Sequence, residues 1–330
     1  MMTRNTFRSV LLLVTLWLAS GPPHALADTV VATVRVPQEP VSVAFSPLAD
    51  RAYVASNRSR VISIITTATS TVTSSIALQV PPNGLAVTPD GTQLWVALDT
   101  LSGNRVLVFD TASQQQLPDI PVGRMPMNIA FRPNGKQAFV TNAFDGTVSI
   151  VRVSDGVVVN TIRVGDNPNG IAVANNSSTG DNTVYVANSN SNTVSYFRPS
   201  NPTAVGTIQV NPTPVGVAAA PDGTQIYVTH FSDNSLSVID VASNQIVRTF
   251  ATGRQPYGVA ARLTSSGDRR IYVACQGENI VQKFKPNGTL KDTIAAGMGP
   301  RAIAAALFSK LVYVTNIFSN DVTVIQADDL

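Results

Sequence analysis

The chain has 330 residues, with 23 Lys and Arg against 20 Asp and Glu, and a single cysteine, Cys275. A chain of this length can bury a large core, and one cysteine excludes an internal disulfide framework. Charges so close to balance exclude a long-range electrostatic field, so nucleic acid could be bound only through a local basic patch.

The N-terminus has the order of a secretory signal peptide. Arg4 and Arg8 precede an apolar run over residues 10–19, and small residues occupy the expected cleavage positions. The run is too short to cross a ~30 Å hydrocarbon core as a permanent helix, although an uncleaved anchor is an alternative. We therefore expect a leader of residues 1–27 and an exported domain of residues 28–330, periplasmic or secreted, without a transmembrane segment. Removing the two arginines of the leader leaves 21 basic against 20 acidic residues.

After an extended segment at 29–36, a repeat of about 43 residues occurs seven times. Each copy carries a proline, and further on an aromatic residue followed by valine. The prolines are Pro40, Pro82, Pro126, Pro168, Pro214, Pro256 and Pro300. The aromatic residues are Tyr53, Trp95, Phe139, Tyr185, Tyr227, Tyr272 and Tyr313.

Each copy is predicted to form four short strands. In the fifth copy these are 215–220, 225–229, 236–241 and 245–251, separated by turn-forming residues. Four strands in each of seven copies predict an all-β, seven-bladed β-propeller of four-stranded antiparallel blades. Two copies carry insertions between their first and second strands.

The two ends of the domain predict how the ring closes. The last copy stops after its third strand, at 322–326, whereas 29–36 has the pattern of an outer strand without its own blade. We therefore expect the N-terminal strand to complete the seventh blade, which leaves neither edge bare.

The innermost strands are predicted to crowd around the axis. Two residues after each proline stands a small residue in most copies, and two further on always an alanine, so both lie on one face of the strand. The first of these positions holds Ser42, Gly84, Asn128, Gly170, Gly216, Gly258 and Ala302. This regularity is primarily a packing pattern.

The segments 139–142, 185–188 and 313–316 read FVTN, YVAN and YVTN. They resemble the signature of the YVTN-type β-propeller repeat, a bacterial family that includes the YncE-like periplasmic proteins, and the resemblance covers residues 29–327. It implies a propeller that is non-enzymatic in most members, and single-stranded DNA binding has been attributed to YncE-like proteins. Because the signature is itself the packing pattern, it specifies no function.

Function is expected where the copies differ, on the face shared by the connections from outer to inner strands and from second to third strands. The positions after the prolines, near the centre of this face, hold Val41, Asn83, Met127, Asn169, Val215, Tyr257 and Arg301. The fourth signature positions hold Ser56, Leu98, Asn142, Asn188, His230, Cys275 and Asn316. The candidate ligand-binding residues are Arg58, Arg124, Arg254, Arg301, Asn83, Asn169, Tyr257 and His230.

The main hypothesis is a monomeric, non-catalytic propeller that binds a protein, a small ligand or nucleic acid on this face, with no cofactor. One alternative is single-stranded DNA binding, which uses loop arginines and aromatic rings for phosphates and bases, unless nearby aspartates cancel the charge. The arginines of this alternative are Arg58, Arg60, Arg105, Arg124, Arg254 and Arg301. Another is a lactonase- or lyase-like enzyme that holds Ca²⁺ or Mg²⁺ in the funnel with Glu39, Asn83, Asp166 and Asn169. For His230 and Cys275 the simpler interpretations are a loop hydrogen bond and an inert buried thiol.

Overall fold

The computed structural model describes residues 27–99, 104–175, 182–306 and 309–328. Within these ranges the chain forms 28 β-strands and no helix, so it contains no helix that could span a membrane. Of the predicted leader, only Ala27 falls among the described residues.

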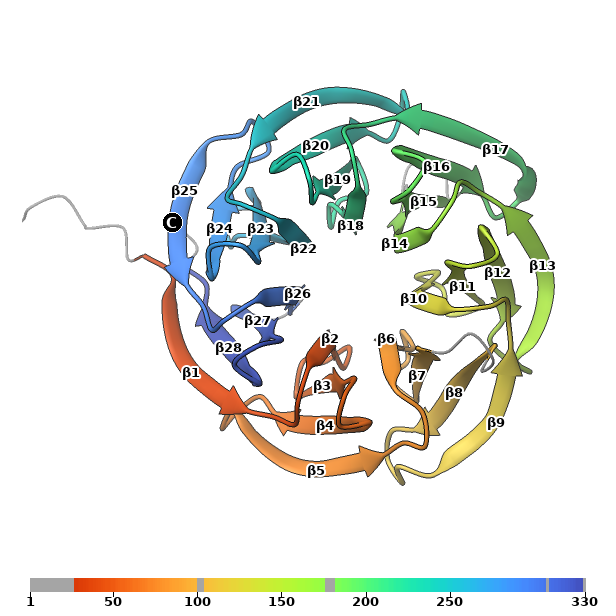
Figure 1. The fold of residues 1–330 in the computed structure, drawn as a ribbon, viewed down its shortest axis with the longest axis horizontal. Helices are drawn as coiled ribbons and strands as arrows, with labels where there is room; N and C mark the ends of the chain where they lie inside the picture. The colour runs from red at the N-terminus through yellow and green to blue at the C-terminus, as the bar shows by residue number, and fades with distance from the viewer. Residues whose placement is uncertain (1–26, 100–103, 176–181, 307–308, 329–330) are drawn as a thin grey trace, which may run out of the picture.

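The strands form seven four-stranded sheets in the described residues, arranged as blades around a central axis (Figure 1). Blade 1 contains β2 (Pro40–Phe45), β3 (Arg51–Ser56), β4 (Val61–Thr66) and β5 (Thr71–Ala77). Blade 2 contains β6 (Pro82–Val87), β7 (Gln93–Leu98), β8 (Arg105–Asp110) and β9 (Gln116–Pro121). Blade 3 contains β10 (Pro126–Phe131), β11 (Gln137–Asn142), β12 (Thr147–Arg152) and β13 (Val157–Arg163). Blade 4 contains β14 (Pro168–Asn175), β15 (Asn182–Asn188), β16 (Thr193–Arg198) and β17 (Asn201–Gln209).

Blade 5 contains β18 (Pro214–Ala219), β19 (Gln225–His230), β20 (Ser235–Asp240) and β21 (Gln245–Ala251). Blade 6 contains β22 (Pro256–Leu263), β23 (Arg269–Cys275), β24 (Ile280–Phe284) and β25 (Leu290–Ala295). Blade 7 joins β26 (Pro300–Ala305), β27 (Leu311–Asn316) and β28 (Asp321–Gln326) to β1 (Thr29–Arg35). All pairings are antiparallel, which confirms the predicted seven-bladed propeller, and the strands of blade 5 lie within one residue of their predicted bounds.

The N-terminal strand closes the ring, as expected. β1 runs antiparallel to β28, with Thr29 opposite Gln326 and Arg35 opposite Asp321. In Figure 1 the first strand lies on the outside of blade 7, beside β28 and next to the outer strand of blade 6. The two ends of the domain therefore meet in one sheet, and β28 has no bare edge.

The inner strands lie close to one another, as the small residues at their positions led us to predict. A Cβ atom at Gly84 would lie 2.2 Å from the carbonyl oxygen of Met127, and one at Gly216 would lie 2.3 Å from that of Tyr257. Neither position has room for a side chain. Blade 1 has Ser42 instead, and its hydroxyl accepts a hydrogen bond from the backbone of the next inner strand.

The hydrophobic core is divided among the interfaces between neighbouring blades. The seven signature aromatic residues are all at most 1% exposed. Tyr227 of blade 5, for example, packs with Val259 and Ile271 of blade 6, and Tyr313 of blade 7 packs edge-on against Phe45 of blade 1. Since each interface uses residues of two blades, every blade depends on both of its neighbours for burial.

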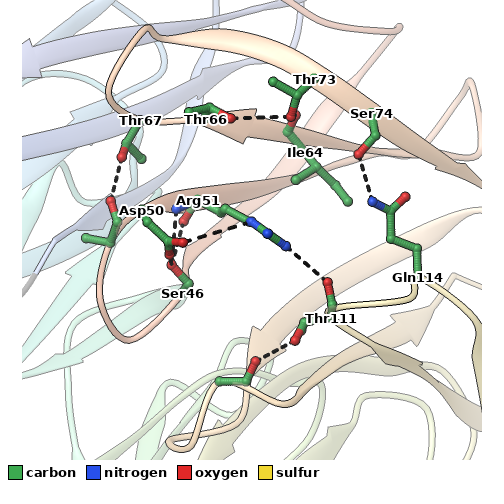
Figure 2. Close-up of polar contacts among 12 residues, drawn as sticks. Ser46, Asp50, Arg51, Ile64, Thr66, Thr67, Thr73, Ser74, Thr111 and Gln114 are labelled. Carbon is green, nitrogen blue, oxygen red and sulfur yellow. Dashed lines mark hydrogen bonds and ion pairs between the residues drawn. The ribbon is translucent and has the colours of Figure 1, made fainter.

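Hydrogen bonds between blades also hold the face made by the connections from first to second and from third to outer strands. Figure 2 shows this face at blades 1 and 2. Arg51 of blade 1 donates from Nη1 to the carbonyl of Thr111 in blade 2 at 3.1 Å, and Gln114 donates from Nε2 to Oγ of Ser74 at 3.0 Å. These two hydrogen bonds connect the blades, whereas others drawn there, such as that between Thr66 and Thr73, lie within blade 1.

Candidate functional site

The opposite face is the one on which the sequence placed the candidate site. It is formed by the connections from outer to inner strands and from second to third strands, and we call it the loop face. Backbone hydrogen bonds tie the two sets together: Asn57 donates to Glu39 at 2.8 Å. In blade 5, Phe231 donates in the same way to Thr213 at 2.9 Å. The expectation that these connections share one face is therefore met.

A cavity of about 170 Å³ lies where the inner strands converge. The seven residues that follow the blade prolines all line it: Val41, Asn83, Met127, Asn169, Val215, Tyr257 and Arg301. Arg301 is the one charged residue in the described lining, which includes no carboxylate. The cavity therefore favours a negatively charged group.

Arg301 is held in place by the neighbouring blade. Its Nη2 donates to the hydroxyl of Tyr257 at 3.1 Å, and its guanidinium lies 4.7 Å from the centre of the Tyr257 ring. Phe231 of blade 5 packs edge-on against the same ring, with the centroids 6.1 Å apart. No described carboxylate forms an ion pair with Arg301. Tyr257, itself packed against Phe231, thus holds a cation whose charge is not neutralised by a described acid.

Amide side chains occupy the other side of the cavity. Asn83 donates from Nδ2 to the carbonyl of Pro126 at 3.2 Å. Asn128 donates to both oxygens of Asn169, the side-chain Oδ1 at 3.1 Å and the backbone carbonyl at 3.3 Å. These bonds link blades 2, 3 and 4, so Asn83 and Asn169 have a structural role in addition to lining the cavity.

Several other candidate arginines are neutralised by acids. Nε of Arg124 contacts Oδ1 of Asp145 at 2.6 Å, and its guanidinium also lies 4.2 Å from the centre of the Phe144 ring. Arg254 contacts Glu278 at 3.4 Å.

Arg105 contacts Asp119 at 3.2 Å, while Arg60 donates to the carbonyl of Gln79. Arg58 is exposed between β3 and β4. The structure therefore brings Tyr257, Arg301, Asn83 and Asn169 together at the cavity, but it does not gather the six arginines into one basic patch.

The fourth signature position is not on the surface. All seven of its residues are at most 1% exposed, because the connection from the outer strand covers them. A Cβ at Gly123, in that connection, would lie 2.6 Å from Cγ of Asn142. His230, a candidate ligand-binding residue, is 0% exposed, and its Nε2 lies 2.8 Å from Oγ of Ser237. Here the structure differs from the expected binding role, since His230 is part of the blade interior.

Burial lowers the pKa of His230 to about 4. In the unfolded chain the pKa of a histidine is ~6.5, so as the pH falls from 7 to 4 the unfolded chain binds a proton at His230 before the folded chain does. Acid therefore lowers the free energy of unfolding through His230. We expect His230→Asn to reduce the loss of unfolding free energy between pH 7 and pH 4 by about 3 kcal/mol. The measurement is urea unfolding of both proteins at pH 7 and pH 4, in which the difference between them cancels the common titration of carboxylates. Equal losses for the two proteins would contradict the buried, neutral histidine.

Cys275 occupies the same position in blade 6 and is likewise buried. Burial raises the pKa of its thiol to about 12, so the reactive thiolate is scarce at neutral pH. We expect Ellman's reagent to leave the folded protein unlabelled and to react with one thiol per chain in guanidinium chloride. Stoichiometric labelling of the native protein would show instead that the thiol is accessible.

Two of the four residues considered for a metal line the cavity. Asn83 and Asn169 line the cavity, whereas Glu39 and Asp166 are absent from its lining. The backbone N–H of Glu39 is bonded to Asn320, and that of Asp166 to Ser191. Among the described residues, no three His, Cys, Asp or Glu side chains are grouped so that they could hold an ion.

Two apolar residues of the loop face in blade 7 were not among the sequence candidates. Phe318 is 63% exposed and Met298 is 54% exposed, and the backbone of Phe318 donates to the carbonyl of Met298 at 3.0 Å. Met298 is three residues from Arg301 in the chain. The only signal in the sequence was that each is a large apolar residue in a connection that is polar in most copies.

The ring of four-stranded blades and its variable loop face define the chain as a β-propeller with a candidate binding surface. Residues 41–262, more than half of the chain, match the family model of the Choice-of-anchor I domain. The chain belongs to this family, and membership indicates a cell-surface or exported protein.

Among solved structures, the chain is similar to hydrazine synthase of Kuenenia stuttgartiensis, with a TM-score of 0.76 and 20% sequence identity. The similarity covers 88% of this chain and 96% of that one. At this identity the likeness concerns the fold alone. No curated protein matches the chain.

Proposed function

We propose that the protein is an exported, non-catalytic binding propeller of the YncE-like type, and that it binds a partner protein on the loop face at blades 5–7. One observation carries this proposal. The loop face of these blades carries a strip of aromatic, apolar and basic side chains, two of which, Tyr257 and Arg301, line a cavity whose described lining has a guanidinium and no carboxylate. The strip consists of Phe231, Tyr257, Arg301, Met298 and Phe318.

The composition of this strip supports a protein partner. Aromatic residues, methionine and arginine are enriched at the centre of protein–protein interfaces, and tyrosine and arginine are frequent among the residues that dominate binding energy. Tyr257 and Arg301 also hold each other in place, so little side-chain entropy would be lost on binding.

The cavity supports an acidic anchor on that partner. Its volume of about 170 Å³ is below the roughly 300–1,000 Å³ of pockets that enclose a drug-sized ligand. A carboxylate side chain or a chain terminus is small enough to enter. The guanidinium of Arg301 would pair with it through charge-assisted hydrogen bonds.

Nucleic-acid binding has less support from the same face. Binding of single strands depends on a groove of uncompensated basic residues, and Arg105, Arg124 and Arg254 are each paired with an acid. The proposal therefore takes a protein as the partner and treats nucleic acid as an outcome of its test.

The test is photo-crosslinking in living cells. A photoreactive benzoylphenylalanine is placed at Phe318 on the loop face, and as a matched control at Leu48, which is 81% exposed on the opposite face. We expect a protein adduct from position 318 that is absent from position 48 and is lost when Arg301→Ala is added. An adduct that nuclease removes, equal adducts at both positions, or none at 318 would refute the proposal.

A further inference from the structure

The residue that directly precedes the first strand, Asp28, is deeply buried. Ala27 is exposed, whereas the Asp28 side chain is 0% exposed. Its Oδ1 lies 2.6 Å from Nζ of Lys283, and its Oδ2 accepts a hydrogen bond from the hydroxyl of Tyr272 at 2.8 Å. Burial and the Asp28 carboxylate both raise the pKa of Tyr272, so this hydroxyl stays protonated and donates.

Asp28 joins both ends of the domain to blade 6. Tyr272 and Lys283 belong to β23 and β24, while the backbone N–H of Asp328, beyond the last strand, donates to Oδ1 of Asp28 at 2.6 Å. Lys283 also donates to the carbonyl of Asp328 at 3.3 Å. We call this set of contacts the latch, because it fastens the strand that closes the ring.

The backbone nitrogen of Asp28 takes part in the latch too. It lies 3.0 Å from Oδ2 of Asp292, on the outer strand β25 of blade 6. In an uncut chain this contact is an ordinary amide hydrogen bond to a carboxylate. If Asp28 were the first residue, the same nitrogen would be an α-ammonium and the contact would become an ion pair.

We propose that the chain is processed between Ala27 and Asp28, and that the new α-ammonium of Asp28 pairs with Asp292 to complete the latch. An endopeptidase of the signal-peptidase class would hydrolyse the peptide bond between Ala27 and Asp28 with water. Ala27 leaves with a carboxylate, and Asp28 keeps the amine, which is protonated at neutral pH because an α-amino pKa is ~8. The hydrogen bond to the Asp292 carboxylate, which now has one charged partner, would then have two.

The latch is sensitive to the position of the cut. Any residue left before Asp28 would keep its nitrogen as an uncharged amide. A cut one residue later would remove the Asp28 carboxylate and leave the Lys283 ammonium buried without its partner, which is strongly destabilising. Cleavage after Ala27 is the one cut that provides both charges of Asp28. This inference is independent of the binding proposal.

The first test is the intact mass of the full chain after export, which should correspond to a chain that begins at Asp28. The second compares two chains with defined ends, one beginning at Asp28 and one at Ala25, by thermal melting. We expect the Asp28 chain to melt about 2 °C higher, as for a single partly exposed ion pair.

Asp292→Asn should abolish this difference between the two chains. The matched control is Asp119→Asn, an aspartate on the outer strand of blade 2, which should preserve it. A mature end at another residue would overturn the proposal. Equal melting of the two chains, or a difference that survives Asp292→Asn, would overturn it as well.

Discussion

Deletion of residues 28–37 is expected to lower the melting midpoint by more than about 10 °C and to cause aggregation on heating. The deletion removes β1, exposes the edge of β28, and takes Val34 and Asp28 from the interface between blade 7 and its neighbours. A bare strand edge is a template for pairing with other chains, and Lys283 would lose its buried partner. Differential scanning calorimetry with light scattering measures both effects.

A circular permutant provides the matched control. Residues 28–37 are moved to the end of the chain through a short glycine–serine linker, so that β1 can still pair with β28. We expect this protein to melt cooperatively and close to the unaltered one, because closure depends on the pairing and not on the position of the strand in the sequence. An unchanged midpoint in the deletion variant would contradict closure by β1.

Lys283→Met is expected to lower the free energy of unfolding by about 3–5 kcal/mol. The substitution keeps much of the volume of the side chain but leaves the Asp28 carboxylate buried at 0% exposure without its cation. Two hydrogen bonds, from Tyr272 and the backbone of Asp328, remain and offset only part of the cost. Urea unfolding at pH 7 gives the value.

The double variant Asp28→Asn with Lys283→Met separates charge from packing. It removes both charges, so we expect it to recover most of the stability lost in Lys283→Met. A loss below about 1 kcal/mol in the single variant would show that the pair contributes no more than an exposed ion pair does.

The architecture could be predicted almost completely from the sequence, because the same packing pattern is written seven times. The small residues near the axis, such as Gly84 and Gly216, let the inner strand of the next blade approach closely, and the signature aromatic residues locate the interfaces between blades. Closure followed from the count of strands at the two ends. In the fifth copy the predicted and observed strands differ only by one residue at some of their ends.

The candidate site could be predicted in part. The residues after the prolines were expected near the centre, and Tyr257 and Arg301 do meet at the cavity there. The burial of His230 could not be foreseen, because a residue at the end of a strand is covered or bare depending on the path of a neighbouring connection. The pairing of Arg124 with Asp145 depends on that path as well.

The contacts of the latch could not be predicted from the sequence either. Asp28 and Lys283 are 255 residues apart, and nothing in the repeat pattern connects a residue before the first strand to the third strand of blade 6. Met298 and Phe318 were missed for a related reason, since each lies in a different connection and only the fold places them together.

Binding of a partner across blades 5–7 is tested most directly by the affinity of the crosslinked partner, purified and titrated by calorimetry. We predict that Arg301→Ala weakens binding at least about tenfold, or ~1.4 kcal/mol, while Leu48→Ala on the opposite face leaves it within about twofold. Equal affinities of the unaltered protein and Arg301→Ala would contradict recognition by the loop face.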